Sequence, residues 1–206
     1  MSDASPAGRS IVEWGWAGSA LDVESGDLHV VVHFADGALV ALMDGLGHGP
    51  EAAAASIAAV PILEAYAGDP VPTLVQRCHE GLRKTRGVAM SLASFDSRHS
   101  SMTWIGVGNV DGVLLRIGGQ AKRRGEAIAL RGGVVGYRLP PLHADTLPVS
   151  QGDTLVMSTD GIRSGFTTDL AIEHGPQEIA ESILARFAKG SDDAHVVVAR
   201  YVGNSR

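Results

Sequence analysis

The stretch from Asp27 to Gly49, DLHVVVHFADGALVALMDGLGHG, contains two apolar runs and decides the fold that we expect. The runs at 27–34 and 38–43 are rich in the aliphatic and β-branched residues that strands favour. Asp36-Gly37 lies between them, and an Asp-Gly pair in that position indicates a hairpin turn. The stretch therefore predicts an antiparallel hairpin that leads, at Asp44, into a glycine-rich loop.

Short strands continue along much of the chain, and helical segments interrupt them. Pro50 and Glu51 mark the start of a helix that we expect to reach Tyr66, with a kink at Pro61. Apolar spacing predicts two more helices, at 73–84 and 179–187. Further strands are expected at 11–17, 89–95, 102–107, 113–117, 127–130, 136–139, 154–158 and 195–201. This order predicts an α+β fold of two packed antiparallel β-sheets flanked by α-helices, an αββα sandwich.

Length and composition limit the classes of function. The 206 residues are expected to form a flexible N-terminal tail, residues 1–10, and a single domain over 11–206. The net charge of −6 argues against a nucleic-acid partner. The single cysteine, Cys78, fits a reducing compartment and is interpreted as a buried bystander. No secretory signal or bilayer-length apolar run is seen, so we expect a cytoplasmic protein with no membrane partner.

The glycine-rich loop, Asp44-Gly45-Leu46-Gly47-His48-Gly49, admits more than one interpretation. Its glycines let the backbone approach a ligand closely, and a helix begins just after it. A nucleotide-binding loop is disfavoured because no Lys-Ser/Thr pair follows and the glycine spacing differs from Gly-x-Gly-x-x-Gly. We favour metal ligation by Asp44, with a plain turn before a helix as the alternative.

Other aspartates lie where predicted strands begin or end. Asp27 opens one strand, Asp160 closes another, and Asp192-Asp193 precedes the last. Each alone is more simply a turn or a cap, and Asp36 and Asp111 are interpreted as hairpin turns. Together with Asp44, carboxylates gathered from distant strand ends are the hard oxygen ligands of a Mg²⁺ or Mn²⁺ hydrolase.

The same segments carry a family resemblance. They are Ser25-Gly26-Asp27, Asp44 to Gly49, Gly106-Val-Gly-Asn109, Ser158-Thr-Asp160-Gly161 and Asp192-Asp193. In this order, over about 11–201, the chain resembles the metal-dependent serine/threonine protein phosphatases of the type 2C superfamily, in their SpoIIE-like branch. Its size and the segments 85–87 and 132–136 are most similar to the small stressosome phosphatases of the RsbX type.

The resemblance implies two metal ions, Mn²⁺ or Mg²⁺, held between the sheets. By that resemblance Asp44 would bridge the ions and the Gly45 carbonyl would hold one of them. Asp160 and Asp192 would bind the second, Asp27 would contribute directly or through water, and Asp193 joins the expected ligand set. Metal-activated water would attack phosphoserine or phosphothreonine, with Asp44 and Asp160 in catalytic roles. The implied substrate is a phosphorylated STAS-domain protein of a stressosome-like signalling module.

Some positions depart from the family pattern. The usual Asp-Asp-x-Thr ending is here Asp192-Asp193-Ala194-His195, and His195 is interpreted as a core histidine satisfied by backbone. No arginine suited to binding phosphate is found near the first strand. His48 could donate a proton to the leaving serine oxygen or only order its loop. The alternative function is a pseudophosphatase that binds a phosphorylated partner without turnover.

Two further polar residues beside these motifs have open roles. Asn109 could orient metal-bound water or cap a turn. Arg163 could contact phosphate, although an exposed loop arginine is the interpretation we favour.

Overall fold

Two antiparallel five-stranded sheets make up most of the computed structural model, which describes residues 10–117, 125–167 and 170–203. The first sheet has the order β1 (Val12–Ser19), β10 (Ala194–Tyr201), β9 (Thr154–Ser158), β6 (Asp111–Leu115) and β7 (Gly125–Ala127). The second has the order β2 (Asp27–Phe34), β3 (Gly37–Gly45), β4 (Val88–Asp96), β5 (Ser101–Val107) and β8 (Asp145–Pro148). The predicted tail at 1–10 lies almost wholly outside the described residues.

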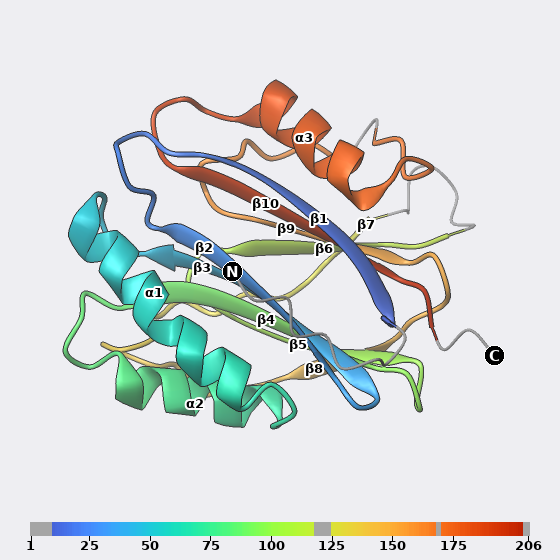
Figure 1. The fold of residues 1–206 in the computed structure, drawn as a ribbon, viewed down its shortest axis with the longest axis horizontal. Helices are drawn as coiled ribbons and strands as arrows, with labels where there is room; N and C mark the ends of the chain where they lie inside the picture. The colour runs from blue at the N-terminus through green and yellow to red at the C-terminus, as the bar shows by residue number, and fades with distance from the viewer. Residues whose placement is uncertain (1–9, 118–124, 168–169, 204–206) are drawn as a thin grey trace.

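Helices cover the outer faces of both sheets (Figure 1). In the described residues, α1 (Pro50–Ala65) and α2 (Val71–Gly81) pack on the second sheet, and α3 (Pro176–Phe187) packs on β1 and β10 of the first. The predicted αββα sandwich is therefore confirmed. None of these helices combines the length and apolar character needed to cross a bilayer.

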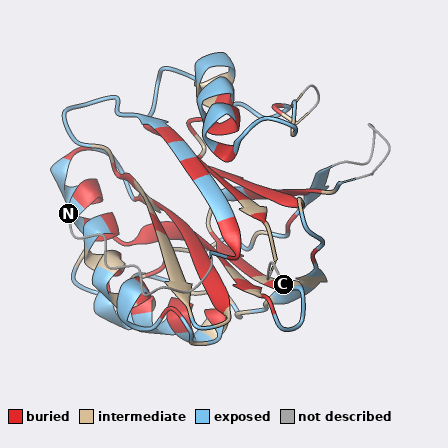
Figure 2. Ribbon diagram, turned by 45° about the vertical axis from the view of Figure 1, so that its right-hand side comes forward, coloured by how far each residue is buried: buried red, intermediate tan, exposed pale blue. Residues whose placement is uncertain are grey.

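The period-two alternation of the strands separates three buried layers (Figure 2). In β3, Ala38, Val40 and Leu42 face the first sheet. The residues between them face α1 and α2, where Cys78 is also buried. A third layer lies between the first sheet and α3. Because β3 is buried on both faces, its two ends are the places where polar side chains can be accommodated.

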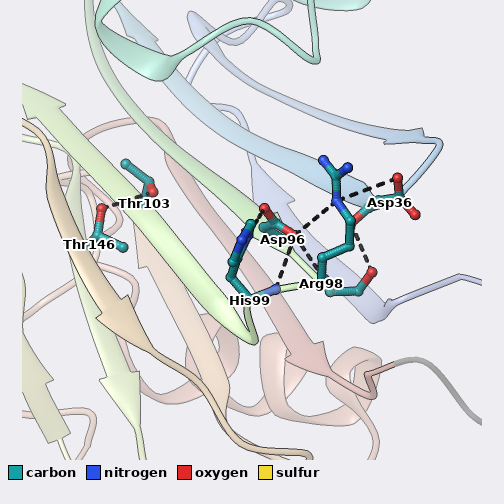
Figure 3. A network of polar contacts seen from close by, with 7 residues as sticks. Asp36, Asp96, Arg98, His99, Thr103 and Thr146 are labelled. Atoms are coloured by element: carbon teal, nitrogen blue, oxygen red, sulfur yellow. Dashed lines mark hydrogen bonds and ion pairs between the residues drawn. The ribbon is translucent and has the colours of Figure 1, made fainter.

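A polar network joins the β2–β3 and β4–β5 hairpins at one end of the second sheet (Figure 3). The expected turn at Asp36-Gly37 is confirmed, since Phe34 pairs with Gly37. The backbone N–H and hydroxyl of Ser97 both donate to the Asp36 carbonyl at 2.9 Å. Arg98 Nε lies 3.6 Å from the Asp36 carboxylate. This network ties two hairpins together and leaves the opposite end of the sandwich open.

Several expectations about local structure were wrong. Asp111 begins β6 rather than forming a hairpin turn. Strand β7 ends at Ala127, and 128–130 do not extend it. The segment at 136–139 is not a strand, because Val134 and Arg138 exchange backbone hydrogen bonds in a tight turn. Strand β8 was missed because it has only four residues, all but Leu147 are exposed, and it ends in proline.

Candidate active site

Asp27 and Asp44 are cross-strand partners at the open end of the second sheet. Alternation from Val40 and Leu42 places Asp44 on the face that looks toward the first sheet. Asp27 shares that face with Val31, four residues along β2. The register of the predicted hairpin thus brings two carboxylates together where the two sheets meet.

The first sheet supplies two more aspartates at the same end. Asp160 follows β9, Asp192 precedes β10, and β9 and β10 are paired in the sheet. The two segments touch at Gly161, where a Cβ atom would lie 1.8 Å from the Asp193 carbonyl oxygen. Only glycine allows this approach. Asn109 Nδ2 donates to Asp160 Oδ2 at 2.7 Å, so the asparagine orients this carboxylate.

Three of the expected ligands line one open pocket of ≈ 390 Å³. Asp44, Asp160 and Asp192 contribute carboxylates to it, and Asn109 and His48 share its lining. His48 is on the exposed rim, with Nδ1 3.4 Å from an Asp22 carboxylate oxygen. Residues more than a hundred positions apart in the chain therefore meet in one acidic depression.

Asp27 is buried and is not part of the pocket lining, and it is held by a side chain that sequence reasoning missed. The Thr159 hydroxyl donates to Asp27 Oδ2 at 2.7 Å and accepts from the His195 backbone N–H at 2.9 Å. Thr159 is 1% exposed. The signal was present in the sequence, because alternation from Leu155 and Met157 in β9 places Thr159 on the face between the sheets.

The Asp193 side chain is hydrogen-bonded to the backbone of the loop between β1 and β2. Its carboxylate accepts N–H groups from Leu21 and Gly26, each at 2.7 Å, and the residue is 6% exposed. These two bonds fix the loop that delivers Asp27 to the end of the sheet. The structure thereby gives Asp193 a structural role that the adjacent Asp-Asp pair did not suggest.

His195 differs from its expected role. Its ring bonds to the ring of His29, Nε2 to Nδ1 at 2.9 Å, rather than to backbone. The ring of Trp16 stacks on His195 with centroids 5.1 Å apart and an interplanar angle of 4°. Burial lowers the pKa of His195 to about 3 and that of His29 to about 4, and His29 adds to the shift of His195. Both rings are therefore neutral near pH 7.

Two other expected residues lie apart from the pocket lining. Gly45 packs against α1, where a Cβ atom would be 2.2 Å from the Ala52 carbonyl oxygen. Arg163 donates through Nη2 to the Arg186 carbonyl at 2.8 Å, beside the end of α3. The structure thus agrees with the interpretation of Arg163 as a loop residue.

The electrostatics of the site favour a bound cation. Burial raises the pKa of Asp27 to about 8; the Thr159 hydrogen bond opposes this shift, and repulsion from Asp44 and Asp193 adds to it. Burial raises the pKa of Asp44 to about 7, with added repulsion from Asp160 and Asp192. A positive ion among these groups would stabilise their charged forms.

The donor set also fits the chemistry of Mg²⁺ or Mn²⁺. Within the described ranges, no three His, Cys, Asp or Glu side chains converge closely enough to surround one ion by themselves. Mg²⁺ keeps several waters and binds through one or two carboxylates, so an open pocket with spaced oxygen donors suits it. The carboxylates and the room for water meet that requirement.

Comparison with known proteins identifies the family. The model of the family described as Stage II sporulation protein E (SpoIIE) matches residues 35–202. The chain belongs to this family. The match covers every residue of the pocket lining except Leu21, and it begins after β1 and β2, so Asp27 lies outside it.

Relatives of the SpoIIE-family chain include phosphatases. Phosphoserine phosphatase RsbX of Bacillus subtilis (strain 168) is 23% identical over 163 residues, which cover 79% of this chain and 80% of that protein. A crystal structure of RsbX in complex with magnesium superposes with a TM-score of 0.81 at 20% identity, covering 92% of this chain and 94% of the other. It shows the same fold.

A second solved structure is somewhat more similar in sequence. It comes from work on the bacterial stressosome as a modular system adapted to control secondary messenger signalling. It has a TM-score of 0.82 and 27% identity, and the alignment covers 92% of this chain and 99% of that chain.

Proposed function

We propose that this SpoIIE-family chain is a metal-dependent phosphatase of phosphoserine or phosphothreonine in proteins. The observation that carries the proposal is the single pocket lined by Asp44, Asp160 and Asp192, which come from three distant segments. The similarity to the phosphoserine phosphatase RsbX supports this reaction class. The pocket is open and acidic, as a site that binds a cation and receives a projecting phosphorylated side chain requires.

The residues that would hold Mg²⁺ or Mn²⁺ are Asp44, Asp160 and Asp192, with Asp27 acting directly or through water. Two ions are proposed, as the family resemblance implies. When bound, such ions lower the pKa of water and neutralise charge on the phosphoryl group. Asp193 is left out of this set, because both its oxygens already accept backbone N–H groups.

The protein's own side chains orient these ligands. Asn109 fixes the rotation of the Asp160 carboxylate through its 2.7 Å hydrogen bond. Thr159 does the same for Asp27 from inside the core. His48, which lines the rim of the pocket, is proposed to donate a proton to the leaving oxygen.

The proposed substrate is a phosphorylated STAS-domain protein of a stressosome-like module. Two observations support this choice, the similarity to RsbX and the similarity to a structure from the bacterial stressosome. Action in the cytoplasm is part of the same proposal.

The test is Mn²⁺-dependent phosphate release from a phosphorylated STAS-domain protein. We expect release by the wild type and loss of at least about a hundredfold in Asp160→Asn, because one carboxylate ligand is removed. Asp145→Asn, which makes the same change of charge at an exposed position in β8, serves as the matched control and should behave as the wild type. Turnover that persists in Asp44→Asn, Asp160→Asn and Asp192→Asn would refute the assignment of the site.

Calorimetry with Mn²⁺ separates this proposal from the pseudophosphatase. Binding of Mn²⁺ together with release of phosphate supports the enzyme. A wild type that binds the phosphorylated partner, but does not bind Mn²⁺ and releases no phosphate, would favour the pseudophosphatase instead.

A further inference from the structure

The described lining of the acidic pocket contains no lysine or arginine. A phosphate monoester carries about two negative charges near pH 7. Three of the lining residues are aspartates. The lining therefore supplies no permanently charged cation to phosphate oxygens that the metal ions do not bind.

Arg86 is placed beside the pocket by a fixed backbone. It lies between α2 and β4, and the next residue, Gly87, has φ 81°. The Gly87 carbonyl accepts the backbone N–H of Leu46 at 3.0 Å, which docks this segment on the glycine-rich loop. A Cβ atom on Gly87 would lie 2.6 Å from the Val135 carbonyl oxygen, so the position requires glycine.

The guanidinium of Arg86 reaches over the glycine-rich loop. A Cβ atom on Gly47 would lie 2.7 Å from Nη1 of Arg86, so the absence of a side chain at 47 leaves this approach open. Gly47 itself lines the acidic pocket. The Arg86 guanidinium thus lies beside a residue that lines the same pocket as Asp44.

The same guanidinium is ion-paired in the free protein. Its Nη2 contacts the carboxylate of Glu51, in the first turn of α1. The side chains of Arg86 and Glu51 are 50% and 68% exposed. An exposed ion pair contributes little to stability, so Arg86 can exchange Glu51 for a phosphate without a large cost.

We propose that Arg86 binds the phosphoryl group of the substrate at the rim of the pocket, and that Glu51 pairs with the arginine in the free protein and competes with the phosphate for it. The assignment of this role in turnover rests on the proposed phosphatase function. A planar guanidinium suits the task because it can contact two phosphate oxygens at once. Arg86 is a substrate-binding residue in this scheme, supplying charge that the aspartates cannot.

The experiment compares Arg86→Ala with Arg86→Lys in the Mn²⁺-loaded full chain. The probes are p-nitrophenyl phosphate for turnover and inorganic phosphate for binding by calorimetry. Loss of a charge-assisted contact made in the bound and transition states alike should raise KM about tenfold or more with little change in kcat. Lysine should restore part of the loss, because it keeps the charge but not the two-point contact.

Matched variants exclude a structural explanation. Arg83→Ala removes an exposed arginine three residues earlier and should leave KM unchanged. Glu51→Gln should lower KM, because it releases Arg86. An increase in KM for Glu51→Gln as large as that for Arg86→Ala would show that the ion pair acts by holding the loop, and would overturn the proposal.

Calorimetry decides the case even if the phosphatase proposal fails. A wild type that releases no phosphate would refute the proposed function alone. Phosphate affinity that falls about tenfold or more in Arg86→Ala would still support the binding role. Equal affinity in wild type and Arg86→Ala, with both proteins folded, would overturn it.

Discussion

Replacing Thr159 with valine tests the link between the protein core and the active site. Thr159 is almost fully buried, and its hydroxyl joins the Asp27 carboxylate to the backbone of His195. Valine has nearly the same shape, so no large cavity forms. The substitution leaves the buried Asp27 oxygen without this donor and the His195 N–H without its acceptor.

The magnitude follows from the two bonds lost. Above pH 8, where Asp27 is ionised, its hydrogen bond to Thr159 contributes about 1.5–3 kcal/mol, and the neutral bond to the His195 N–H contributes about 0.5–1.5 kcal/mol. We expect Thr159→Val to lower the free energy of unfolding by about 2–4 kcal/mol. With a urea m-value of about 2 kcal/mol/M, the midpoint should fall by about 1–2 M.

Urea unfolding followed by tryptophan fluorescence measures this change, with Thr103→Val as the control. The Thr103 hydroxyl shares one exposed 3.1 Å hydrogen bond with Thr146 (Figure 3), so its loss should shift stability much less. A Thr159→Val midpoint that equals that of the Thr103 variant would refute the reasoning. The Asp27–Thr159 bond would then carry no net stability.

The other predictions separate neighbouring residues of the site. Asp192→Asn should lower Mn²⁺ affinity about tenfold or more in calorimetry with unchanged stability, because Asp192 is exposed and lines the pocket. Asp193→Asn should instead lower the free energy of unfolding by about 1–3 kcal/mol, because an amide cannot accept both backbone N–H groups. Gly161→Ala should destabilise by about 1–3 kcal/mol or more in urea unfolding, because its Cβ overlaps the Asp193 carbonyl. When the pH falls from 7 to 5, the contribution of His195 to the free energy of unfolding should fall by about 2 kcal/mol, because over this range His195 takes up a proton only in the unfolded chain.

The pKa of His195 is lowered from 6.5 to about 3 in the folded protein, so its contribution is present above pH 6.5 and is lost as the pH falls toward 3. The raised pKa values of Asp27 and Asp44 act in the opposite direction. The difference between wild type and His195→Gln isolates the histidine, and an identical pH dependence in both would contradict it.

For the aspartate pair, the decisive result is the contrast between the two variants. Equal effects of Asp192→Asn and Asp193→Asn on Mn²⁺ affinity would contradict their separate roles.

Gly165→Ala is the control for Gly161→Ala, because it adds the same methyl group at a position without a close neighbour. It has open space for a Cβ, so any cost there comes from its φ of 90° and not from a clash.

Local patterns in the sequence were sufficient for most of the fold. The runs at 27–34 and 154–158 predicted β2 and β9 with their observed bounds, because alternating or continuous apolar residues and turn pairs are local signals. The segment at 136–139 was wrongly predicted as a strand, and strand β8 was not predicted. A five-residue turn and a short exposed edge strand differ little in composition from ordinary loops.

The sequence by itself also determined which carboxylates end up at the open end of the sandwich. Asp44 and Asp160 come directly after apolar runs of the sequence, near strand ends, where a polar group can stay hydrated. What each side chain does there was decided by tertiary structure. Asp192 and Asp193 are adjacent and chemically identical, yet one lines the pocket and the other holds the β1–β2 loop. The approach of Arg86 to Gly47 likewise depends on segments whose contact appears only when the chain is folded, because hydrogen bonds and exposure depend on distance in space and not on position in the chain.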